Sequence, residues 1–122
     1  MRRLGPLVVS CLARVEVPAA LWRKQRLEEI SSEDAELLSA AFVTDYRGTG
    51  EEDPRFTAMA LTEAILAAGA EACAVHGLRA YDGIQLAAAV AARGADPGCT
   101  RFVCFDAELS AAAGRTGFDT TP

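Results

Sequence analysis

The sequence predicts a small α/β domain with a mainly parallel sheet flanked by helices. Short apolar runs of the kind that form buried strands, at 7–9, 56–61 and 101–105, alternate with longer segments of helical periodicity. This alternation is typical of parallel sheets joined by crossover helices. A chain of 122 residues is long enough for one domain with a hydrophobic core. We therefore expect a single domain over residues 1–122.

The chain is expected to begin with a strand and a helix. The apolar run 7–9 is followed by Ser10, a residue type that caps helix N-termini. A helix is expected over 11–27, where apolar residues recur at helical spacing. Pro18 lies inside this segment and is expected to kink the helix.

Local signals bound the next two helices. One is expected to start at Ser31 or the serine after it, because acids crowd its first turn, and to end near Tyr46. After the strand at 56–61, Thr62 can cap a helix over 63–76, which Gly77 is well placed to end.

The C-terminal part is expected to continue the alternation. A fourth helix follows a short turn and should stop at Gly94. The compact strand at 101–105 leads to Asp106, which starts the last helix, and 117–120 could form a short final strand. In sheets of this type, ligands gather at the carboxyl ends of the strands, where Asp106 is placed.

Charge and composition limit the classes of function. The net charge is −5, whereas proteins that bind nucleic acid regardless of sequence usually carry a basic surface. Eleven of the twelve basic residues are arginines, which are good partners for phosphate. Arg14, Arg23, Lys24 and Arg26 fall on one predicted helix, either as phosphate ligands or as a solvated face.

Cysteine and histidine usage argues against a zinc site. The cysteines at 11, 73, 99 and 104 form no CxxC pair, and His76 is the single histidine. No stretch approaches the roughly 20 apolar residues that span a bilayer. The apolar run near the N-terminus is interrupted and has no evident cleavage site. We expect reduced thiols, no membrane partner and a cytoplasmic protein.

Three acidic residues in apolar surroundings are candidate ligands. Asp82 starts an apolar helix and, with Gln85 three residues later, also fits a capping box. Asp106 could equally cap its own helix. Glu16 is expected mid-helix, where an ionised carboxylate needs water, an arginine partner or a cation. Clustered carboxylates are the ligands that Mg²⁺ and Mn²⁺ prefer, so the three acids together favour a metal site.

The segments around these acids resemble a known family. "SCLARVE" (10–16), "GLRAYDGIQLAAAV" (77–90) and "FVCFDAEL" (102–109) are similar to three consecutive sequence blocks of PIN domains. The resemblance is closest to the VapC-type toxins of bacterial type II toxin–antitoxin systems, and it runs from about residue 7 to the C-terminus. It implies a compact three-layer α/β fold around a small, mainly parallel sheet.

The same resemblance implies a chemistry and partners. PIN domains of this type are metal-dependent endoribonucleases that hold Mg²⁺ or Mn²⁺ with acidic side chains. Carried over residue by residue, Glu16, Asp82 and Asp106 would be the catalytic metal ligands. Arg14 and Arg79 are candidates for holding the RNA backbone. A small antitoxin protein and a second copy of the chain are the implied protein partners.

The resemblance is incomplete at the N-terminus. PIN domains begin with a central strand carrying an Asp in a pattern like LDxSAL, and nothing in this sequence matches it. One metal ligand and one strand would then be missing, through truncation, which we favour, through gene decay, or because another chain supplies the strand. Two alternatives to an active ribonuclease stay open: a non-catalytic module for dimerisation or antitoxin binding, and a structural domain with three ordinary caps.

Overall fold

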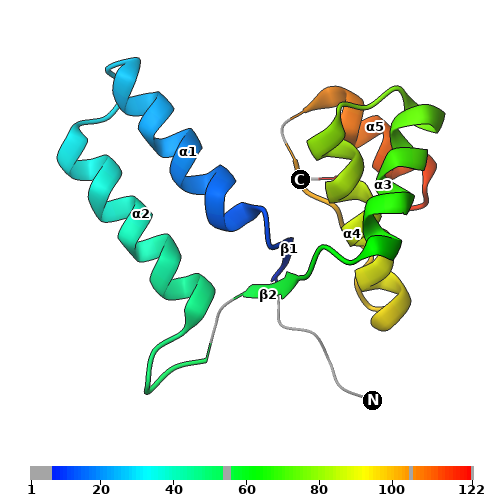
Figure 1. The fold of residues 1–122 in the computed structure, drawn as a ribbon, viewed down its shortest axis with the longest axis horizontal. Coiled ribbons are helices and arrows are strands. Elements are labelled where there is room, and N and C mark those ends of the chain that lie inside the picture. The colour runs from blue at the N-terminus through cyan, green and yellow to red at the C-terminus, as the bar shows by residue number, and fades with distance from the viewer. Residues whose placement is uncertain (1–6, 54–55, 105, 122) are drawn as a thin grey trace. The chain divides into compact units, whose positions relative to one another are not determined.

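The computed structural model describes residues 7–53, 56–104 and 106–121. These residues form a mixed α/β structure with five helices and a two-stranded parallel sheet (Figure 1). The chain divides into two compact units, which we call the N-terminal unit (residues 7–58) and the C-terminal unit (residues 59–121). The α/β class is confirmed at this level, and the expectation of a single domain stays a prediction.

The N-terminal unit holds the sheet. β1 (Leu7–Ser10) pairs with β2 (Phe56–Met59), whose last residue leads into the C-terminal unit. Both strands were expected, although β2 is two residues shorter than the apolar run that predicted it. The Phe56 ring of β2 lies 5.5 Å from the Phe42 ring, measured between centroids. This aromatic pair joins the sheet to the helices of the same unit.

α1 (Ala13–Arg26) follows β1 after a short turn. The prediction that Ser10 caps this helix is wrong, because Ser10 is the last residue of β1 and Leu12 is the N-cap. Strand pairing of Ser10 takes precedence over the local capping preference of its side chain. The helix is continuous through Pro18, and the expected kink there stays a prediction.

α2 (Ser32–Arg47) begins where the sequence predicts. The Ser31 side chain accepts a hydrogen bond from the Asp34 N–H at 3.0 Å, which satisfies one of the unpaired donors at the helix start. α1 and α2 lie side by side as a hairpin (Figure 1). The basic residues expected on one helix are all in α1, three of them in its last turn, where positive charge is favourable.

α3 (Glu63–His76) opens the C-terminal unit with both predicted boundaries. The Thr62 side chain accepts from the Ile65 N–H at 3.2 Å. Gly77 ends the helix with a φ of +67°, in the left-handed region that glycine adopts without strain. Both boundary predictions are confirmed.

α4 (Ala80–Ala95) and α5 (Ala107–Arg115) complete the helices. The prediction that α4 stops at Gly94 is wrong, because the helix includes Gly94 and ends at the next residue. Helix packing and the Asp96 N–H, which bonds to the Ala92 carbonyl at 2.8 Å, extend the last turn past the glycine.

The core of the C-terminal unit is made where α4 and α5 meet the turn before α4 and the C-terminal segment. Small side chains let these elements approach closely, and two leucines fill the middle. Its buried members are Leu78, Leu86, Leu109, Ala112, Ala113 and Phe118. Alanines of α5 therefore form part of a helical core.

The predicted strands at 101–105 and 117–120 are reduced to one parallel bridge between Arg101 and Asp119. The Phe102 N–H donates to the Asp119 carbonyl at 2.9 Å, and the Asp119 N–H donates to the Thr100 carbonyl at 2.8 Å. Phe105, the end of the predicted strand, lies outside the described residues. The two segments pair with each other over a shorter length than a strand requires.

α3 and α4 approach closely at two glycines. A Cβ on Gly83 would lie 2.6 Å from the Gly69 carbonyl oxygen and against the Cys73 Sγ. A Cβ on Gly69 would lie 3.3 Å from the backbone of Ile84. The two helix backbones therefore fit together because neither glycine has a side chain at the crossing.

The glycine crossing yields a test with a control on the same helix. Gly83→Ala should destabilise the protein by about 1–3 kcal/mol, because the added methyl overpacks the crossing. Gly94→Ala, also in α4, meets nothing within 4 Å and should stabilise by about 0.5–1 kcal/mol through helix propensity. Urea unfolding measures both. Equal effects of the two variants would show that the helices do not cross closely at Gly83.

Candidate functional site

Asp82 lies in the first turn of α4 and is not its N-cap. The N-cap is Arg79, which has extended backbone and makes no side-chain capping bond. The capping-box interpretation of Asp82 with Gln85 is therefore wrong, because the helix starts two residues before Asp82. At this position the carboxylate interacts favourably with the partial positive charge of the helix N-terminus.

Asp106 does cap its helix, as one of its two interpretations predicted. Its Oδ1 accepts a hydrogen bond from the Leu109 N–H at 2.8 Å, at the start of α5. Its side chain is solvent-exposed. The capping bond fixes the orientation of the carboxyl group and uses only Oδ1.

Burial and several charged side chains influence the pKa of Asp82. Burial raises the pKa of Asp82 above its ordinary value, the Asp106 carboxylate raises it further, and Glu108 adds a smaller increase. The Arg79 guanidinium opposes these effects and lowers the pKa of Asp82. The C-terminal unit therefore brings two of the three predicted site residues together. We call Arg79, Asp82, Asp106 and Glu108 the acidic site.

Glu108 is a site residue that the sequence analysis missed. It lies in the first turn of α5, two residues after Asp106. In the segment "FDAEL", Glu108 follows the predicted ligand Asp106 by two residues. This short spacing is the sequence signal by which Glu108 could have been predicted. Its effect on Asp82 depends on how α4 and α5 pack, which local sequence does not specify.

Cys104 borders the acidic site. Its Sγ donates a weak hydrogen bond to the Asp106 backbone carbonyl at 3.4 Å. Burial raises the pKa of the Cys104 thiol, a hydrogen bond from the Asp106 backbone to the sulfur lowers it, and the Asp106 and Asp82 carboxylates raise it. Because the thiolate is the nucleophilic form, Cys104 is suited to packing beside the acids and is a poor nucleophile.

Glu16 belongs to the N-terminal unit. It lies in the first turn of α1 and is half-buried. The expectation that it lies mid-helix is therefore wrong, because α1 begins later than its periodicity suggested. In the described ranges, no three His, Cys, Asp or Glu side chains are grouped as a metal-binding cluster. The combination of Glu16 with Asp82 and Asp106 stays a prediction.

The predicted arginines are distributed between the units. Arg14 is half-buried in α1, and Arg79 is exposed beside Asp82. Lys24 forms an exposed ion pair with Glu29 at 3.2 Å. Arg79 is thus the basic residue that the structure places next to the acids.

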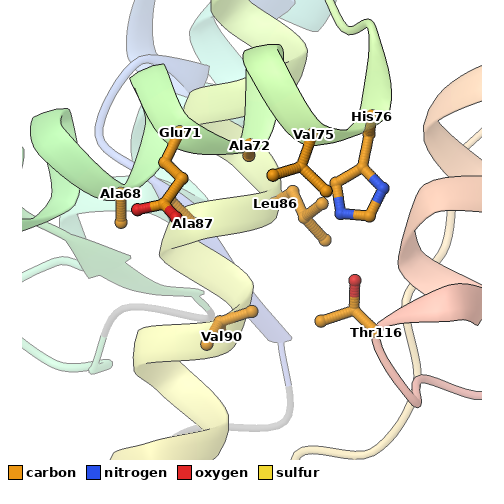
Figure 2. Close-up of a pocket in the computed structure, with 9 residues that line it drawn as sticks. All are labelled: Ala68, Glu71, Ala72, Val75, His76, Leu86, Ala87, Val90 and Thr116. Atoms are coloured by element: carbon orange, nitrogen blue, oxygen red, sulfur yellow. The ribbon is translucent and has the colours of Figure 1, made fainter.

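A hollow of about 260 Å³ lies on the face formed by α3 and α4 (Figure 2). Its lining is mainly apolar, and the His76 ring beside it has Nδ1 at 3.4 Å from the Arg115 Nη2. Neither Asp82 nor Asp106 lines it, so it is separate from the acidic site. The lining residues are Ala68, Glu71, Ala72, Val75, His76, Leu86, Ala87, Val90 and Thr116.

The raised pKa of Asp82 predicts a pH dependence of stability. The folded protein binds this proton more tightly than the unfolded chain, so Asp82 costs stability as pH rises from about 4 through its raised pKa. Asp82→Asn should remove that loss, and its melting temperature relative to wild type should rise over this range.

Asp119→Asn is the control with the opposite sign. The Thr121 backbone N–H donates to Asp119 Oδ1 at 2.9 Å, and hydrogen bonds from Thr121 lower the pKa of Asp119. Its stabilisation is present above the unfolded pKa and is lost as pH falls through the folded one. The melting temperature of this variant relative to wild type should therefore fall as pH rises. Parallel curves for Asp82→Asn and wild type would contradict the raised pKa.

Comparison with known proteins gives no assignment. No family model matches the chain, and neither the curated proteins nor the solved structures contain a match. Among the helices of the described residues, none is long and apolar enough to span a membrane.

Proposed function

We propose that this protein is a metal-dependent endoribonuclease similar to the VapC-type PIN toxins. The observation that carries the proposal is the raised pKa of Asp82, to which burial and the Asp106 carboxylate contribute. Asp82 is half-buried, caps no helix start and lies near two other acids. The same two residues lie in the segments whose sequence resembles PIN domains. The proposal includes a three-layer fold with a small parallel sheet.

Asp82 and Asp106 supply the type of oxygen donor that a hard divalent cation prefers. Burial raises the pKa of Asp82, and repulsion from the Asp106 carboxylate raises it further. A Mg²⁺ or Mn²⁺ ion prefers such oxygen donors and would relieve the repulsion. In the proposal Asp82, Asp106 and Glu16 hold the ion. When bound, it would lower the pKa of a water molecule and neutralise charge on the phosphodiester.

The chain's own residues have defined roles in this proposal. The capping bond to Leu109 holds the Asp106 carboxyl group in one orientation and leaves Oδ2 outside that bond. The first turn of α4 carries both Asp82 and the exposed Arg79. Arg79 would bind a phosphate of the RNA backbone, for which a guanidinium is well suited. Cys104, with its protonated thiol, packs beside the acids.

A second candidate function is a non-catalytic module that binds a partner protein. The apolar hollow between α3 and α4 favours it, because Val75 on its rim is 67% exposed. The proposed partners are a small antitoxin protein and a second copy of the chain. The two candidates differ in whether the acidic site binds a metal and cleaves RNA.

Metal binding is tested by thermal unfolding of the protein at increasing Mn²⁺ concentrations. Mn²⁺ should raise the melting temperature in proportion to the logarithm of its concentration once above the Kd. Asp82→Ala should abolish the shift, because it removes a proposed metal ligand. Asp82 is not a helix cap, so this loss should not come from disrupting a cap. Asp119→Ala changes an exposed acid outside the acidic site and should keep the shift. A full shift in Asp82→Ala would remove Asp82 from the site.

Catalysis is tested with labelled single-stranded RNA. Wild type with Mn²⁺ or Mg²⁺ should cleave it, chelation should stop cleavage, and Asp106→Asn should reduce the rate by about a hundredfold or more. Asn can still accept the capping bond, so this variant should keep its fold and lose the charge. Metal binding without RNA cleavage would favour the non-catalytic module.

A further inference from the structure

Cys73 lies where α3 turns back toward α4. Its backbone carbonyl accepts the Gly77 N–H at 2.9 Å, the bond that closes the end of α3. Its Sγ lies 3.5 Å from the Arg79 carbonyl oxygen, to which the thiol donates. One residue therefore contacts both ends of the turn between the two helices.

The same thiol packs against the backbone of α4. The Cys73 Sγ occupies the space that a side chain on Gly83 would take. Gly83 is buried, and Cys73 packs against the hydrophobic core of the C-terminal unit. The sulfur thus lies between the core and the start of α4, in space that is available because Gly83 has no side chain.

The Arg79 carbonyl joins the thiol to the first turn of α4. This oxygen also accepts the Gly83 N–H at 2.9 Å, which is the first hydrogen bond of the helix. The turn that this bond closes contains Asp82. Arg79, whose carbonyl receives both bonds, carries the guanidinium that interacts with Asp82.

We propose that Cys73 is a positioning residue, whose thiol holds the start of α4, where Arg79 is the N-cap and Asp82 lies in the first turn. It acts through the Arg79 carbonyl and the Gly83 backbone. The role in catalysis rests on the proposed function, whereas the positioning of the turn rests on the contacts alone. Arg79 makes no side-chain capping bond at this helix start, and the thiol adds a separate contact to the Arg79 carbonyl.

Amide hydrogen exchange, followed residue by residue by NMR, tests the positioning. Cys73→Ala removes the donor and the sulfur, and should speed exchange at Gly83 and Ile84 by about fivefold or more relative to Ala88 in the middle of α4. Cys73→Ser keeps a hydroxyl donor for the Arg79 carbonyl and should restore most of the protection.

Two controls separate positioning from general loss of stability. Ala88→Gly weakens the buried middle of α4. It should speed amide exchange at Gly83 and at residue 88 by similar factors. Cys99→Ser changes a thiol in the turn after α4 and should leave the first turn unchanged. The proposal is overturned if Cys73→Ala speeds exchange no more at Gly83 than at Ala88, or if Cys73→Ser behaves like Cys73→Ala.

A measurement of Mn²⁺ binding tests whether the role of Cys73 extends to the acidic site. If wild type binds Mn²⁺, Cys73→Ala should raise the Mn²⁺ concentration needed for half of the melting-temperature shift by about threefold or more, and Ala88→Gly should not. An unchanged midpoint in Cys73→Ala would overturn the link to the site. If wild type binds no Mn²⁺, the proposed function fails, and the exchange experiment still decides the positioning.

Discussion

The close crossing of α3 and α4 is the constraint on which the C-terminal unit depends. It exists because Gly69 and Gly83 present backbone in place of side chains at the crossing. The Cys73 Sγ occupies the space that a side chain on Gly83 would take. The crossing also sets where the first turn of α4 lies, and therefore where Asp82 stands relative to α5. The packing of α3 on α4, the position of the first turn of α4 and the position of Asp82 therefore all depend on this crossing.

The other end of α4 is held by a different kind of contact. The Arg93 guanidinium lies 4.1 Å from the centre of the Phe118 ring and donates to the Thr116 carbonyl at 2.9 Å. A cation over an aromatic face and a charged hydrogen bond both add stability. α4 is thus anchored at its start by a thiol and a glycine, and near its end by an arginine that binds the segment after α5.

The features that the sequence predicts correctly are those decided by neighbouring residues. Ser31, Thr62 and Gly77 bound helices as expected, because a capping side chain or a left-handed glycine acts within a few residues. Asp82 was misassigned as a possible cap because the true N-cap, Arg79, has no capping side chain to mark it. The effect of Glu108 on Asp82 and the role of Cys73 depend on how helices pack, and neither can be read from the periodicity of the sequence.

The capping bond of Asp106 affects which residue types would be retained at this position during evolution. One oxygen serves the stability of α5 through Leu109, so selection for folding alone would keep Asp or a similar residue at this position. Asp82 has no comparable duty at a helix start. In a lineage that had lost its activity, position 106 would stay acidic or amide-bearing long after position 82 had drifted. Persistence of an acid at 82 is therefore the more informative mark of a site under selection.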